Sequence, residues 1–143
     1  ESCMFVTLFL AILDIRTGEV NYCNAGHNPP ILCTADQVAY LQSMNEPIAG
    51  AMPEVSYSTQ QLTLAPGDTL FLYTDGVTEA MNNEQELYSD ERLLEFMIQT
   101  KTASTTDIID QVNHSVAKFA DGAEQSDDIT MLALTYTATQ QRT

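Results

Sequence analysis

The sequence is poor in basic residues. It has 5 lysines and arginines against 20 aspartates and glutamates, which gives a formal net charge of -15 at pH 7. A surface of this charge repels nucleic-acid phosphates and anionic lipid headgroups, so we expect neither nucleic-acid nor membrane-surface binding. The sequence also has no signal segment and no apolar run of about 20 residues, the length that spans a bilayer.

Several familiar chemical patterns are missing as well. There is no His-x-x-x-His or Cys-x-x-Cys pair for zinc, no Gly-x-x-x-x-Gly-Lys phosphate loop, no Asp-x-Asp-x-Asp-Gly calcium loop and no Gly-x-Ser-x-Gly nucleophile elbow. Cys3, Cys23 and Cys33 have no metal-ligand spacing and lie in strand-like runs, which indicates free, buried thiols. Free thiols are typical of a reducing compartment, so we expect a cytoplasmic protein.

The patterns that are present predict an α+β fold, with a hydrophobic fraction of 44% that is sufficient for a core. The run over 4–15 is almost continuously apolar, which is typical of a strand covered on both faces. Further strands are expected over 20–24, 31–33, 38–41, 55–64, 69–74 and 128–134. Hairpin spacing predicts mainly antiparallel pairing, within a single domain over 1–143 that ends in a polar tail at 137–143.

Two amphipathic helices are expected before the last strand. Ser89 is the predicted N-cap of the first helix and Ser104 or Thr105 that of the second, which Asp121-Gly122 should end. The apolar stripes comprise Leu93, Leu94, Met97 and Ile98 in the first helix, and Ile108, Ile109, Val112, Val116 and Phe119 in the second.

Acidic residues stand at two places where a strand meets a loop. Asp75 ends the strand over 69–74, and Gly76 after it lets the backbone turn sharply. Asp127 and Asp128 open the last strand. Carboxylates held there could bind Mg²⁺ or Mn²⁺, which prefer oxygen ligands. From spacing alone, an ordinary turn and a solvated strand start explain these residues better.

Four sequence blocks occur in order: Asn-Ala-Gly-His-Asn-Pro-Pro at 24–30, Pro-Gly-Asp at 66–68, Tyr-Thr-Asp-Gly-Val-Thr-Glu-Ala at 73–80 and Gln-Ser-Asp-Asp-Ile-Thr at 125–130. This series resembles the SpoIIE/RsbU branch of the metal-dependent (PPM, protein phosphatase 2C-like) serine/threonine phosphatases, and the likeness covers residues 3–136. The resemblance implies a β-sandwich flanked by helices, with a two-metal site at one end.

In such a site Mn²⁺ or Mg²⁺ holds the water that attacks a phosphoserine or phosphothreonine, so no side chain is the nucleophile. By resemblance, Asp75 and Asp127 are the metal ligands. Asp128 ranks below Asp127, because adjacent strand residues point to opposite faces. Gly76 would shape the backbone, and Asn24 and His27 would support their loop.

One family element is missing. An Asp-x-x-Gly-His-Gly block, which supplies a bridging carboxylate and a backbone carbonyl upstream of a strand like 4–15, does not occur. The chain starts at Glu1, almost directly in that strand. We therefore expect the C-terminal portion of an N-terminally truncated domain, with an incomplete metal site and no activity by itself. Its uncovered apolar face and strand edges would favour a homodimer.

The leading interpretation is a phosphatase domain that is active in a full-length bacterial signalling protein. By family analogy, its substrate would be a phosphorylated anti-anti-sigma-type regulator, and a sensory or receiver domain would lie upstream. The main alternative is a non-catalytic interaction domain that kept the fold and lost the chemistry. A third interpretation is a small acidic binding module with no metal. An Asp-x-x-Gly-His-Gly block upstream would favour the enzyme.

Overall fold

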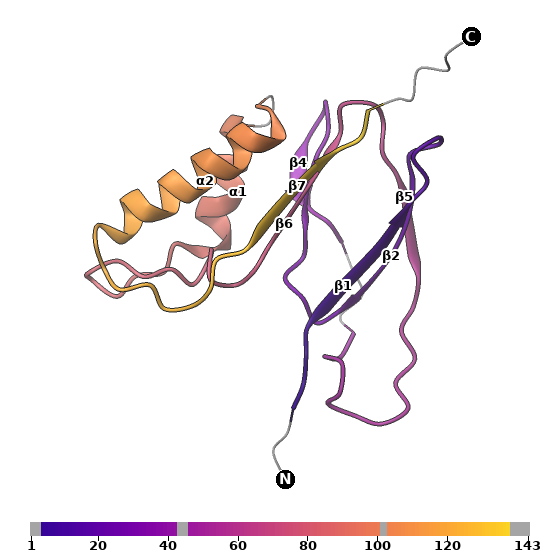
Figure 1. Ribbon diagram of the computed structural model, residues 1–143, viewed down its shortest axis with the longest axis horizontal. Coiled ribbons are helices and arrows are strands. Elements are labelled where there is room, and N and C mark those ends of the chain that lie inside the picture. Colours follow the sequence, from indigo (N-terminus) through magenta and orange to yellow (C-terminus); the bar gives the residue numbers. More distant parts are fainter. Residues whose placement is uncertain (1–3, 43–45, 101–102, 138–143) are drawn as a thin grey trace.

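Three layers make up the molecule: two helices, a four-stranded sheet and a three-stranded sheet (Figure 1). The computed structural model describes residues 4–42, 46–100 and 103–137. Strand order in the smaller sheet is β1-β2-β5, and in the larger sheet it is β4-β3-β6-β7. The strands are β1 (Leu8–Leu13), β2 (Glu19–Ala25), β3 (Ile31–Cys33), β4 (Val38–Tyr40), β5 (Gln60–Thr63), β6 (Thr69–Tyr73) and β7 (Met131–Thr135).

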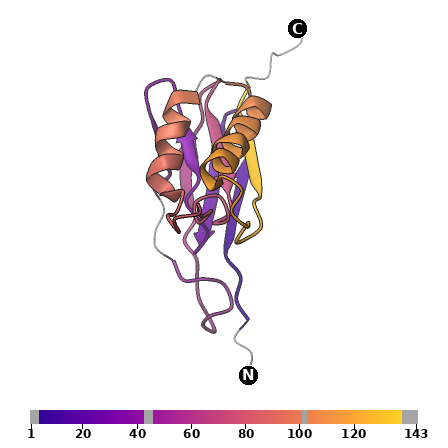
Figure 2. The same cartoon turned by 90° about the vertical axis from the view of Figure 1, so that its left-hand side faces the viewer.

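The two helices cover the outer face of the larger sheet, side by side (Figure 2). Helix α1 (Ser89–Thr100) contacts β3 and β4, and helix α2 (Thr105–Ala120) contacts β7. Every pair of named strands is antiparallel. The predicted α+β sandwich, with two helices before the last strand, is therefore confirmed.

Strand β6 is central because its alternate side chains enter two different cores. Phe71 and Tyr73 pack toward the helices, whereas Leu70 and Leu72 pack toward the smaller sheet. The core on the helix side also contains Ile31, Cys33, Val77, Leu93, Met97, Ile108, Val112 and Val116. The core between the sheets also contains Val20, Tyr22, Leu41, Leu64 and Tyr136.

Helix α1 is fixed at its start by two tyrosines from the larger sheet. The Tyr73 hydroxyl donates to Asp90 Oδ1 at 3.2 Å, and the Tyr40 hydroxyl donates to the Asp90 carbonyl at 2.8 Å. Burial raises the pKa of Tyr40 to about 12, so its phenol stays a proton donor at neutral pH. The predicted helix start at Ser89 is found, although its φ of 72° differs from the extended backbone usual for an N-cap.

Helix α2 has the predicted signals at both ends. The Ser104 side chain accepts from the Asp107 N–H, so Ser104 rather than Thr105 is the N-cap. Asp121 adopts the left-handed conformation with φ of 48°, and its N–H donates to the Ala117 carbonyl. Both caps satisfy backbone groups that the helix leaves without partners.

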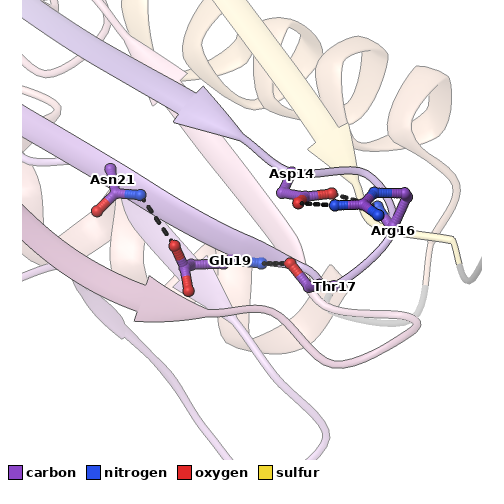
Figure 3. Close-up of polar contacts among 5 residues, drawn as sticks. All are labelled: Asp14, Arg16, Thr17, Glu19 and Asn21. Atoms are coloured by element: carbon purple, nitrogen blue, oxygen red, sulfur yellow. Dashed lines mark hydrogen bonds and ion pairs between the residues drawn. The ribbon is translucent and has the colours of Figure 1, made fainter.

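The hairpin between β1 and β2 is set by short-range hydrogen bonds (Figure 3). Asp14 accepts from the backbone N–H of Arg16 at 2.8 Å and from its guanidinium at 3.1 Å. The backbone hydrogen bond from Arg16 is the main cause that lowers the pKa of Asp14. Gly18 has a φ of 78°, and a Cβ there would lie 2.2 Å from the Leu64 carbonyl oxygen, so only glycine fits.

Strand β1 corrects one expectation. Phe9 and Leu13 pack on the core between the sheets, but the opposite face is open, with Leu10 57% and Ile12 68% exposed. A continuous apolar run in the sequence does not show whether another part of the protein covers each face of the strand. Strands β1 and β7 each pair with a single neighbour, so both sheets end in an edge. An apolar cavity of 310 Å³, lined by residues of both strands, lies between these edges.

Three strands are also shorter than predicted, and the first covers only Leu8–Leu13 of the run over 4–15. Within 55–64 only Gln60–Thr63 forms a strand, because the ladder with β2 ends at the Tyr22–Gln60 pair. The last strand begins at Met131 rather than at 128. The polar tail lies outside the described residues from 138 onward.

The two cysteines in the described residues are free thiols, as predicted. Burial raises the pKa of the Cys33 thiol to about 11, so it is not a reactive thiolate at neutral pH. Cys23 is half-buried, and Cys3 lies outside the described residues. Among the helices of the described residues, none is long and apolar enough to cross a membrane.

Met97 and Ile98 give a matched test of the packing of α1. Met97 is fully buried, whereas Ile98 is 51% exposed although it was assigned to the same apolar stripe. We expect Met97→Ala to lower the free energy of unfolding by about 2–5 kcal/mol, through lost burial and a residual cavity. Ile98→Ala should change it by about 0.5 kcal/mol or less. Urea titration of both variants measures the difference, and equal losses would contradict this packing.

Candidate functional site

Two loops that are far apart in the sequence meet at one end of the larger sheet. Residues 74–88 connect β6 to α1, and residues 121–130 connect α2 to β7 (Figure 1). They meet because β6 and β7 are antiparallel neighbours, with Tyr73 opposite Met131. The last residue of β6 and the first residue of β7 therefore lie at the same end of the sheet, which brings the two predicted acidic blocks together.

Thr74 fastens the two loops beyond the last strand pair. Its backbone N–H donates to the Thr130 carbonyl at 3.0 Å. Its side-chain hydroxyl donates to the Asp128 carbonyl at 2.8 Å and accepts from the Thr130 N–H at 3.0 Å. Sequence reasoning did not single out Thr74. The available signal was its place directly before Asp75 within a recognisable block.

Gly76 is buried against the backbone of the second loop. A Cβ at this position would lie 2.5 Å from the Asp128 carbonyl oxygen and 3.1 Å from the Asp127 carbonyl oxygen. No larger residue fits without moving one of the two loops. The backbone at Gly76 thus lies directly against the backbone of the second loop.

The carboxylates are held at the surface of this junction. The Asp75 carbonyl accepts from the Glu79 N–H at 2.7 Å, which closes a turn directly after the aspartate. Asp127 Oδ1 accepts from the Asp128 N–H at 2.7 Å, and Gln125 Nε2 donates to the Asp127 carbonyl at 2.7 Å. Asp75, Asp127 and Asp128 are all exposed, so a ligand can reach their carboxylates without any opening of the fold.

The structure removes one argument for preferring Asp127 over Asp128. That argument placed both residues in a strand, where neighbours point to opposite faces. Because β7 begins only at Met131, Asp127 and Asp128 lie in the loop before it. The preference for Asp127 now rests on the sequence motif alone.

Asn24 and His27 form a separate group at the end of β2. The Asn24 amide donates to the His27 carbonyl at 2.9 Å and accepts from the His27 N–H at 2.8 Å. In this way one side chain closes the loop around Gly26, where a Cβ would lie 2.4 Å from Ile48. Within the described part of the chain, His27 Nδ1 is buried and makes no hydrogen bond. The Asn24 side chain thus closes its loop, to which His27 contributes its backbone groups.

The donor set fits a hard divalent cation in kind but not in number. Carboxylate oxygens suit Mg²⁺ and Mn²⁺, and Mg²⁺ requires an octahedral shell. Across residues 4–42, 46–100 and 103–137, no group of three or more His, Cys, Asp or Glu side chains could hold a metal ion. A cavity of 570 Å³ adds no ligand to this site, because it lies beside Asp68 and Thr69 at the opposite end of β6.

Comparison with known sequences gives a family match and several relatives. A model of the family described as Stage II sporulation protein E (SpoIIE) matches residues 1–137. Protein IcfG of Synechocystis sp. is 34% identical over 134 residues, which cover 94% of this chain and 21% of IcfG. Phosphoserine phosphatase RsbU of Bacillus subtilis is 24% identical over 135 residues, which cover 94% of this chain and 40% of RsbU. The chain thus spans less than half the length of these relatives.

A solved structure supports the fold. The chain is similar to the phosphatase domain of the cell fate determinant SpoIIE from Bacillus subtilis, presoaked with Mn, with a TM-score of 0.73 at 22% identity. The match covers 94% of this chain and 58% of that domain.

Gly76→Ala tests the junction between the loops. The added methyl group must displace the Asp127–Asp128 backbone, so we expect a loss of about 1–3 kcal/mol in unfolding free energy. Amide hydrogen exchange should also become faster over 74–80 and 125–130. Gly67→Ala is the control, because its Cβ would meet nothing within 4 Å and only its φ of 99° is unfavourable. It should leave exchange in both loops unchanged, and the same exchange pattern in both variants would refute the contact.

Proposed function

The chain belongs to the SpoIIE family of PP2C-like phosphatase domains, and we propose that it forms part of a metal-dependent phosphatase acting on phosphoserine or phosphothreonine in proteins. The observation that carries this proposal is the junction at Gly76, where the Asp75 loop lies directly against the Asp127–Asp128 backbone. A hydrolase that binds a cation at the end of its sheet needs acidic loops that are fixed to each other at the surface.

In this proposal, Asp75 and Asp127 are ligands of Mn²⁺ or Mg²⁺, while Thr74 and Gly76 hold the two loops at a constant separation. A bound cation would offset negative charge on the phosphoryl oxygens and make water a better nucleophile. The Mn soak of the similar SpoIIE domain supports Mn²⁺ as one such ion. Asp128, Asn24 and His27 would act through the shape of their loops.

The chain by itself should have little or no activity, because two carboxylates are too few for two metal ions. An Asp-x-x-Gly-His-Gly block is absent from the sequence, and the match covers 58% of the SpoIIE domain. We therefore propose that this is the C-terminal portion of a longer phosphatase domain. The remaining ligands would then come from the rest of that domain.

We propose the substrate and the partners by analogy with the family. One relative is named a phosphoserine phosphatase. A phosphorylated anti-anti-sigma-type regulator is our proposed substrate, with a sensory or receiver domain upstream and a cytoplasmic location. The shortage of ligands among the described residues favours a second candidate, an interaction domain that retains the phosphatase fold without the chemistry.

Substitution of the two proposed ligands separates these functions. In a protein extended upstream to include the rest of the domain, we expect Mn²⁺- or Mg²⁺-dependent phosphate release from a phosphoprotein. Asp75→Asn and Asp127→Asn should each lower turnover by about 100-fold or more, since loss of mere supporting partners of metal ligands costs 10–100-fold. Both should keep the fold, because the change removes a charge but little volume.

Asp36→Asn is the matched control, since Asp36 is an exposed aspartate in the turn between β3 and β4. It should retain full activity, and His27→Ala should lose less than either ligand variant. Activity that survives a chelator, or full activity in both ligand variants, would rule out the mechanism. An extended protein inactive on every phosphoprotein tried would favour the interaction domain.

The open face of β1 leads to a prediction about assembly. We propose that the chain forms homodimers through β1, where Leu10 and Ile12 are exposed beside an unpaired edge. Sedimentation velocity at micromolar concentration should show a dimer, which Ile12→Lys should convert to monomer. Ile98→Lys, on the helical side of the molecule, should remain dimeric. A wild-type monomer over the whole concentration range would contradict this proposal.

A further inference from the structure

The positive charge of the described surface is concentrated in one groove. Only Arg16, Arg92 and Lys118 are basic among the residues that the structure describes. Arg16 is paired with Asp14 at 3.1 Å. Arg92 on α1 and Lys118 on α2 line the same groove of 350 Å³ between the helices, and no ion pair joins either of them to another described residue. We call this the α1–α2 groove.

Aromatic side chains position Arg92 within the groove. Its guanidinium lies 4.9 Å from the centre of the Phe119 ring, a cation–π distance. Phe119 in turn meets Tyr88 edge to face at 5.5 Å, and the Tyr88 and Ser115 hydroxyls are hydrogen-bonded at 2.7 Å. A guanidinium held over a ring loses less freedom when it then binds a carboxylate.

A favourable interaction with the helix dipole explains the position of Lys118 but not that of Arg92. Lys118 lies in the last turn of α2, where positive charge interacts favourably with the helix dipole. Arg92 lies near the start of α1, directly after Asp90 and Glu91, where the dipole disfavours positive charge. Glu95 is the acidic residue that lines the groove.

We propose that the α1–α2 groove binds a short acidic segment of a partner protein. Carboxylates of that segment would contact Arg92 and Lys118, and an apolar side chain between them would cover Phe96 and Phe119. Charge selects this occupant. A nucleic acid would bring many phosphates against a chain of net charge -15, and the proposed contact with a second copy lies on β1, in the other sheet. A short segment, by contrast, places its few negative charges next to Arg92 and Lys118 only.

Fluorescence anisotropy with a labelled glutamate-leucine peptide tests this proposal on the chain as it is, at low salt. Arg92→Glu and Lys118→Glu should each weaken binding by about fivefold or more, which corresponds to about 1 kcal/mol. Glu95→Gln should strengthen binding. Arg16→Glu makes the same change in net charge outside the groove and should keep the affinity within about twofold.

Circular dichroism and thermal unfolding of each variant show whether the fold is kept. If a charge reversal unfolds the chain, Arg92→Gln and Lys118→Gln replace it and should still weaken binding. The proposal is overturned if the peptide does not bind, or if Arg16→Glu weakens binding as much as Arg92→Glu. It is also overturned if folded groove variants bind normally, or if they abolish the dimer in sedimentation, since a second copy would then be the occupant.

Discussion

The alternation of side chains along β6 is the constraint on which the other layers depend. One face of the strand, with Phe71 and Tyr73, belongs to the core beneath the helices, and the other face belongs to the core between the sheets. A shift of one residue would exchange the two faces, so each set of side chains would enter the core that is packed around the other set. The register of β6 is therefore fixed by two independent cores, and its neighbours β3 and β7 take their positions from it.

This register carries the candidate site. Tyr73 stands opposite Met131, so the residues that follow β6 and the residues that precede β7 must meet at the same end of the sheet. Thr74 then replaces a further strand pair with side-chain hydrogen bonds, and Gly76 allows backbone contact. The acidic loops are thus positioned by the sandwich itself, and their exposed carboxylates contribute no packing of their own.

The helices and strands could be predicted from the sequence, because hydrophobic periodicity, caps and turn residues are local signals. The family could be predicted because four sequence blocks occur in a recognisable order. It failed where the outcome depends on distant parts of the chain. The open face of β1 looks the same in sequence as a covered one, and Ile98 lies just outside the buried stripe. The role of Thr74 depends on a partner loop that no local pattern reveals. Whether Asp75 and Asp127 bind metal remains a prediction.

The position of β7 after all the other named elements has a consequence for how this fold assembles during synthesis. Strands β1 to β6 and both helices leave the ribosome before β7, yet α2 packs on β7 and the second acidic loop is held by Thr74 only through pairing with it. Contacts between such distant residues form slowly. The nascent chain therefore has β6 as a temporary edge, and its acidic loops are joined only after β7 has been synthesised.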